Sequence, residues 1–184
     1  MNIAKKWSVF PGLYVWPVLM MLSIMAAAWV NIPFTAQGSV AVTLQGLFFM
    51  LTGLVLGSRV GPLIAVAYVG LGLLGLPVFP QGQSGMAALT GAYGGYLLGG
   101  VACTMSCSIN TQRDAGSFQS VLMKCFSGYF IWLLLGSLMY KSATGVDFAQ
   151  ALATGFTPFI PSMVVLCAAA AGLYCFMCGK GWVR

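Results

Sequence analysis

Six long apolar stretches divide this chain and constrain its fold more than any other feature. They span approximately residues 12–32, 40–57, 61–76, 91–109, 120–140 and 158–178. A helix needs about 20 mainly apolar residues to cross a bilayer, and the third stretch falls short of that length. Charged residues make up 5% of the chain, whereas soluble domains carry roughly 25%. We therefore predict an all-α integral membrane protein in which residues 1–184 form one domain of six transmembrane helices.

The positive charges predict how these helices are oriented. With six crossings, one side of the membrane holds both termini and the connections after the second and fourth helices. Basic residues on or next to that side are Lys5, Lys6, Arg59, Arg113, Lys124, Lys180 and Arg184. The other side has only Lys141. Because basic residues gather on the cytoplasmic side, we expect both termini in the cytoplasm and a multi-pass protein of the bacterial cytoplasmic membrane.

This topology also accounts for the net charge of +6, so we expect a lipid bilayer and no nucleic acid as a partner. The first apolar stretch follows Lys5 and Lys6, an arrangement that resembles a signal peptide. It is longer than the usual apolar core of such a peptide, which has about 7–15 residues. We expect the first helix to be retained.

Histidine and acidic residues, on which most enzymes depend for catalysis, are nearly absent from the chain. The chain has no histidine and 2 acidic residues, which excludes a His-based metal site, a Ser-His-Asp triad and a paired-carboxylate hydrolase. It also lacks a phosphate-binding loop of the Gly-x-x-x-x-Gly-Lys-Ser/Thr type. We expect neither an enzyme nor a cofactor. If the protein drives uphill transport, the ATPase belongs to another chain.

The 6 cysteines allow one alternative. Most of them are predicted to lie toward the reducing side of the membrane, so we expect no disulfide. Their spacing is not that of a zinc ribbon or finger, and cysteine often fills apolar cores, so we expect no metal site. A membrane thiol enzyme that uses Cys175 and Cys178 remains open as an alternative.

Small residues recur where helices are expected to pack closely. Gly91, Gly95 and Gly99 are four residues apart in the fourth stretch, a spacing that lets helix backbones approach each other in lipid. Ser23 and Ala27 form a similar pair in the first stretch. This second pair fits either packing inside the bundle or contact with a partner helix.

The predicted outer side collects irregular, polar and aromatic segments. Two of its loops are rich in proline, with Pro77 and Pro80 in one and Pro158 and Pro161 in the other. Helix-breaking backbone at membrane depth is tolerated where it is buried or lines a cavity. Neighbouring Tyr, Phe, Gln and Ser side chains suit a pocket for a neutral small molecule. We predict a substrate pocket at the outer face.

Several of these segments resemble one known family. They are Thr43-Leu-Gln45, Gly57-Ser-Arg-Val-Gly61, Tyr68, Gly70-Leu-Gly-Leu-Leu-Gly-Leu-Pro-Val-Phe79, Gly94-Gly-Tyr-Leu-Leu-Gly99 and Phe156-Thr-Pro-Phe-Ile-Pro161. Together they resemble the BioY family, the biotin-binding S components of energy-coupling factor (ECF) transporters. The resemblance implies a six-helix fold, biotin as the substrate captured at the outer face, and two kinds of partner. These partners are a membrane T component, which Ser23 and Ala27 would contact, and two cytoplasmic ATPase subunits.

The resemblance also implies where the substrate binds. The candidate substrate-binding residues are Phe34, Thr43, Gln45, Val78, Phe79, Gln81, Tyr93, Gly94, Gly95, Tyr96, Lys141, Ser162, Met163 and Leu166. The family usually has an Asp-x-x-Lys pattern where this chain has Met163 and Leu166, and a Thr where it has Tyr93. The biotin carboxylate would then face solvent, accept neutral hydrogen bonds, or pair with Lys141. The alternatives to biotin uptake are a related small vitamin such as lipoate, or a ligand-free membrane scaffold.

Overall fold

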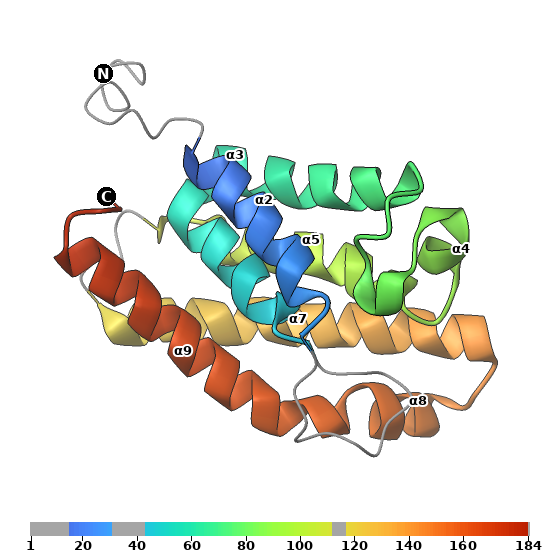
Figure 1. The fold of residues 1–184 in the computed structure, drawn as a ribbon. Helices are drawn as coiled ribbons and strands as arrows, with labels where there is room; N and C mark the ends of the chain where they lie inside the picture. Colours follow the sequence, from blue (N-terminus) through green and yellow to red (C-terminus); the bar gives the residue numbers. More distant parts are fainter. Residues whose placement is uncertain (1–14, 31–42, 112–116, 184) are drawn as a thin grey trace.

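The computed structural model describes residues 15–30, 43–111 and 117–183, and these residues are mainly helical. The helices are α2 (Val15–Ala27), α3 (Gln45–Leu73), α4 (Gly85–Thr90), α5 (Gly94–Ser108), α7 (Phe118–Thr144), α8 (Phe148–Gly155) and α9 (Ile160–Gly179). Two short 3-10 turns, Pro80–Gly82 and Thr157–Phe159, connect them. Some residues with predicted roles lie outside the described ranges, namely Phe34, Lys5, Lys6, Arg113 and Arg184. Figure 1 shows α2, α3, α5, α7 and α9 packed side by side as a bundle.

Most of the predicted second and third apolar stretches, residues 45–57 and 61–73, lies in α3. We expected a connection between residues 57 and 61, but helical structure continues through this region and breaks only at Gly57. Gly57 has φ 72° and ψ −174°, a conformation that is open to glycine and strained for other residues. The chain bends there so sharply that Gly61 packs against Thr52 and Gly53 of the preceding arm. One flexible residue therefore replaces the expected loop.

Three helical stretches within the described ranges are long and apolar enough to cross a membrane. They are Gln45–Leu73, Phe118–Thr144 and Phe148–Gly179, and Val15–Ala27 is a shorter apolar helix. Their length and composition support a membrane protein. Because α3 is bent at Gly57, its two arms lie in two of the six predicted crossings, at 40–57 and 61–76. The number of crossings stays a prediction.

Glycines allow α5 and α7 to pack closely. A side chain at Gly95 would meet the carbonyl oxygen of Leu135 and the side chain of Met139, both on α7. A side chain at Gly99 would meet the backbone of Trp132, about one turn before Leu135 in α7. The predicted role of this glycine spacing in helix packing is thus confirmed for Gly95 and Gly99, whereas Gly91 lies before α5 begins.

One end of the bundle is covered by short segments, residues 74–93 and 145–159, which we call the cap. The cap contains α4 and α8, which lie toward the same side of the molecule in Figure 1. We expected residues 141–157 to be a long connection, but α7 continues to Thr144 and α8 occupies much of the remainder. The cap touches the helix ends that carry most candidate substrate-binding residues.

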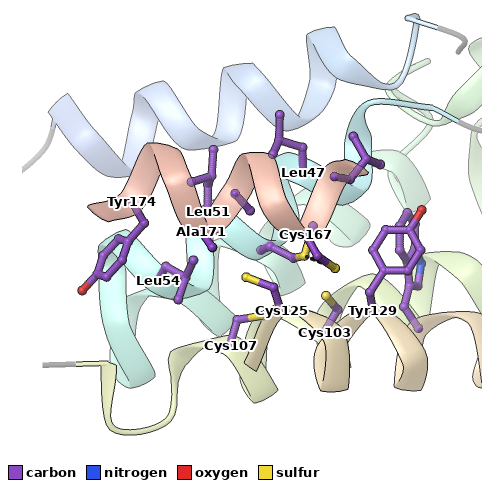
Figure 2. Close-up of a cluster of buried hydrophobic side chains, with 14 of the residues drawn as sticks. Leu47, Leu51, Leu54, Cys103, Cys107, Cys125, Tyr129, Cys167, Ala171 and Tyr174 are labelled. Atoms are coloured by element: carbon purple, nitrogen blue, oxygen red, sulfur yellow. Dashed lines mark hydrogen bonds between the residues drawn. The ribbon is translucent and has the colours of Figure 1, made fainter. Parts of the chain in front are cut away.

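A second region of the core is lined by sulfur. Cys103 and Cys107 on α5, Cys125 on α7 and Cys167 on α9 are all fully buried, and their side chains gather in one space (Figure 2). The Cys167 thiol lies 3.8 Å from the Met50 sulfur. Within the described ranges, no three His, Cys, Asp or Glu side chains are arranged to hold a metal ion. These cysteines act here as apolar core residues.

Candidate functional site

A buried hydrogen-bond relay connects two of the predicted site residues. The side-chain amide of Gln45, at the start of α3, donates to the Tyr68 hydroxyl over 2.6 Å. That hydroxyl donates in turn to the carbonyl oxygen of Val78 in the cap over 2.8 Å. Tyr68 is 0% exposed. The relay therefore fixes the cap loop to both arms of α3.

An aromatic wall runs from the cap loop to α7. Phe79 is buried and packs edge-to-face on Tyr68, with ring centroids 5.7 Å apart. Tyr68 meets Phe49 at 5.8 Å, and Phe49 meets Trp132 at 6.1 Å. Trp132 then meets Tyr129 at 5.0 Å. Such edge-to-face pairs stabilise one another beyond their apolar contact, so these buried rings link the cap loop, α3 and α7.

The predicted site residues include Phe79 but not the rest of this wall. Phe49 and Trp132 belong to apolar stretches in which nothing local separates a wall residue from a lipid-facing one. Tyr68 is one of the residues that carry the family resemblance. The sequence feature that could have identified it as a site residue is a polar hydroxyl within an otherwise apolar helix. Such a hydroxyl needs a buried partner, here supplied by Gln45 and Val78.

Removing the Tyr68 hydroxyl is expected to loosen the cap loop. In a Tyr68→Phe variant the Val78 carbonyl and the Gln45 amide lose their shared partner. Leaving buried polar groups unpaired lowers the free energy of unfolding by about 1–3 kcal/mol. Thermal unfolding of the detergent-solubilised protein, followed by circular dichroism, measures the change. Tyr93→Phe is the control, because the Tyr93 hydroxyl accepts an exposed bond from Gln81; equal losses in both variants would contradict the proposed relay.

A second set of contacts anchors α5 to the cap. The Tyr96 hydroxyl donates to the carbonyl oxygen of Gly155 over 2.7 Å. The Tyr96 ring stacks on Phe159, with centroids 5.7 Å apart and an interplanar angle of 23°. The indole N–H of Trp132 donates to the Tyr96 carbonyl oxygen. The predicted residues Gly94, Gly95 and Tyr96 are all buried where this anchoring occurs.

The first turns of α9 bring three predicted residues to the same region. The Ser162 hydroxyl donates to the Phe159 carbonyl oxygen over 2.7 Å and lies 3.5 Å from the Tyr129 hydroxyl. Leu166 is 3% exposed, and Met163 is partly buried against the same core cluster. This face of α9 therefore offers one hydroxyl and otherwise apolar surface.

Other predicted residues lie at the margins of this region. Thr43 is buried just before α3. The Gln81 amide donates to the Tyr93 hydroxyl over 3.3 Å in an exposed position, and Gln81 has a φ of 61°. Lys141 is exposed near the end of α7, with its ammonium 5.7 Å from the centroid of the Phe148 ring. Phe34 lies outside the described residues.

The predicted partner-contact residues lie on α2. Ala27 is 3% exposed, because it packs within the chain, and Ser23 is half-buried. The exposed face of α2 carries larger apolar side chains, among them Leu19 and Leu22, with the small residue Ala26 beside them. Ser23 therefore borders the open face of the helix, whereas Ala27 contacts its own bundle.

Taken together, the polar groups of the site are neutral and mutually satisfied. Gln45, Tyr68, Tyr96 and Ser162 all have hydrogen-bond partners within the chain. Among the described side chains, no fully buried nitrogen or oxygen lacks a partner. The arrangement suits recognition of a small molecule through apolar contact and neutral hydrogen bonds.

Comparisons with known proteins show the family and the fold of this chain. The sequence matches the model of the BioY family over residues 7–179. Its relatives include the biotin transporter BioY of Thermotoga maritima, 34% identical over 74% of this chain and 78% of that protein. Another is the biotin transporter BioY2 of Lactococcus lactis, 36% identical over 67% of this chain and 68% of that protein. The fold matches a crystal structure of the S-component for biotin from an ECF-type ABC transporter, with a TM-score of 0.83, 18% identity and full coverage of both chains.

Proposed function

We propose that this chain, which belongs to the BioY family, is the subunit that captures biotin for uptake into the cell. The observation that carries the proposal is the match of nearly the whole chain to a family whose relatives are named biotin transporters. The chain acts as a transport subunit and carries out no reaction on its substrate. The absence of histidine and glutamate in the sequence supports this role.

The proposed site lies between the cap and the outer ends of the long helices. Biotin has a bicyclic head, with a ureido group and a sulfur ring, and a valeric acid tail. The head needs apolar walls, which the aromatic wall and α9 would provide, and oriented neutral hydrogen bonds. The side-chain oxygens of Gln45, Tyr96 and Ser162 would accept these bonds from the ureido N–H groups, since their donors are already used within the chain. The remaining members of the proposed site are Phe34, Thr43, Val78, Phe79, Gln81, Tyr93, Gly94, Gly95, Met163 and Leu166.

The proposed topology has six crossings of the bacterial cytoplasmic membrane, both termini in the cytoplasm and the cap at the outer face. The described charges support it. Arg59 follows the bend at Gly57, and the Lys124 ammonium donates to the carbonyl of Ile109 just after α5 ends. Lys180 follows the last residue of α9. All three lie at the end of the bundle opposite the cap, as the positive-inside rule requires of a cytoplasmic end.

Turnover requires partners in this proposal: a membrane T component and two cytoplasmic ATPase subunits. The proposed contact with the T component is the face of α2 that includes Ser23. Its small side chain and that of Ala26 allow close approach of another helix. Because Ala27 is covered by its own chain, it reaches a partner only if α2 shifts relative to α3.

Titration calorimetry on the detergent-purified protein tests the proposed substrate. We expect saturable binding of biotin and no heat of binding for lipoate, a vitamin with a similar acid tail and a different head. Tight binding of lipoate instead would identify a related vitamin as the substrate. A folded sample that binds neither compound would overturn the proposal and favour a ligand-free membrane scaffold.

A further inference from the structure

Charged side chains are scarce at the end of the molecule that holds the proposed site. The chain has 8 basic and 2 acidic residues, and of the charged residues that the structure describes only Lys141 and Asp147 belong to the cap or to the helix ends beside it. Asp147 is exposed and directly precedes α8. Among the residues that the structure describes, a ligand held here therefore meets at most one cation.

That cation lies at the surface. Lys141 is in the last turn of α7, and its ammonium is held over the ring of Phe148, an exposed residue at the start of α8. This cation–π contact directs the charge to the outside of the cap. An ion pair formed at so exposed a position changes an affinity by less than about fivefold.

The buried part of the site offers no replacement for a cation. The inner face of α9 presents Met163 and Leu166, which are apolar, and the hydroxyl of Ser162 already donates to Phe159. Gln45 and Tyr96 donate to partners within the chain. Burying an ionised carboxylate without a cation or free donors is very unfavourable. Among the described residues, the buried part of the site therefore gives the acid group of the ligand no cation to pair with.

We infer that this protein recognises the uncharged bicyclic head of its ligand and does not bind the carboxylate through an ion pair. This inference rests on the proposed function and narrows it to a substrate class. The class includes biotin whose carboxyl group is free, and also biotin whose carboxyl group is joined to an alcohol or an amine. In each of them the head enters the site and the end of the tail stays at the aqueous rim.

Titrations with a matched set of ligands test the inference. Biotin, its methyl ester and its primary amide are each titrated into the same preparation of the intact protein. We expect all three dissociation constants to agree within about fivefold, because an exposed ion pair contributes no more than that. Desthiobiotin, which lacks the sulfur ring but keeps the acid, is expected to bind more weakly than the ester.

The outcomes separate this inference from the function on which it rests. If biotin does not bind, the proposed function fails. If biotin binds and the ester and amide lose about tenfold or more, the carboxylate makes a charge-assisted bond and the inference is wrong. A Lys141→Met variant then tests whether Lys141 is the partner of the carboxylate, since methionine removes the charge and keeps an apolar side chain over Phe148.

A pH titration provides an independent readout. A carboxylic acid of this type has a pKa of about 4–5, and the chain has no histidine that would titrate nearby. Between about pH 4 and pH 7 we expect the biotin affinity to follow that of the ester, which does not titrate. A loss of biotin affinity on acidification that the ester does not share would overturn the inference.

Discussion

A Gly95→Leu variant is expected to lose about 3 kcal/mol of stability, because its side chain has no space between α5 and α7. Even a single carbon at Gly95 would lie 2.6 Å from the carbonyl oxygen of Leu135 and 2.6 Å from Met139. The first of these atoms belongs to the backbone of α7, so the two helices would have to separate. Tyr96, the next residue, would then lose its bond to Gly155 in the cap.

Thermal unfolding in detergent measures this loss. Gly172→Leu is the matched control, because Gly172 also lies within a helix and a Cβ atom at that position would meet no neighbouring atom within 4 Å. We expect Gly172→Leu to melt close to the natural protein. If the two variants melt alike, close packing at Gly95 is not what holds α5 against α7.

The glycine pattern shows how far the sequence predicts this fold. The four-residue spacing in the fourth apolar stretch indicates that a helix packs closely there. It does not identify α7 as the neighbour, because that depends on contacts between residues about 40 positions apart, such as Gly95 and Leu135. The helical stretches follow from apolar length alone, whereas the bend at Gly57 depends on a backbone conformation that composition does not reveal.

The candidate site can be predicted in a similar, partial way. The sequence points to Gln45 and Phe79, which lie in distinctive segments, and the structure connects them through Tyr68. The aromatic wall beyond Tyr68 could not be predicted, because Phe49 and Trp132 come from different helices and meet only in the folded bundle. The folding of residues 148–155 into α8 also depends on tertiary contacts, among them the bond from Tyr96 to Gly155.

A Leu166→Lys variant is expected to be strongly destabilised. Leu166 is 3% exposed within a core cluster of α9, α7 and α3, so an ammonium placed there has neither water nor a partner. A lysine in the middle of a membrane helix costs about 3 kcal/mol. Thermal unfolding in detergent and the yield of folded protein measure the loss. Leu166→Met is the control, because it keeps the volume and polarity of the site and costs less than about 1.5 kcal/mol.

Adding Met163→Asp to this variant tests whether the apolar face of α9 determines which ligands are accepted. Positions three apart on a helix are neighbours, so the new carboxylate can pair with the new ammonium and is expected to restore part of the lost stability. The double variant would also carry a cation beside the site. A free biotin carboxylate could then be held by an ion pair, and we expect the double variant to prefer biotin over its methyl ester, unlike the natural protein. If the double variant is folded and still binds both ligands equally, the residues at 163 and 166 do not control recognition of the acid group.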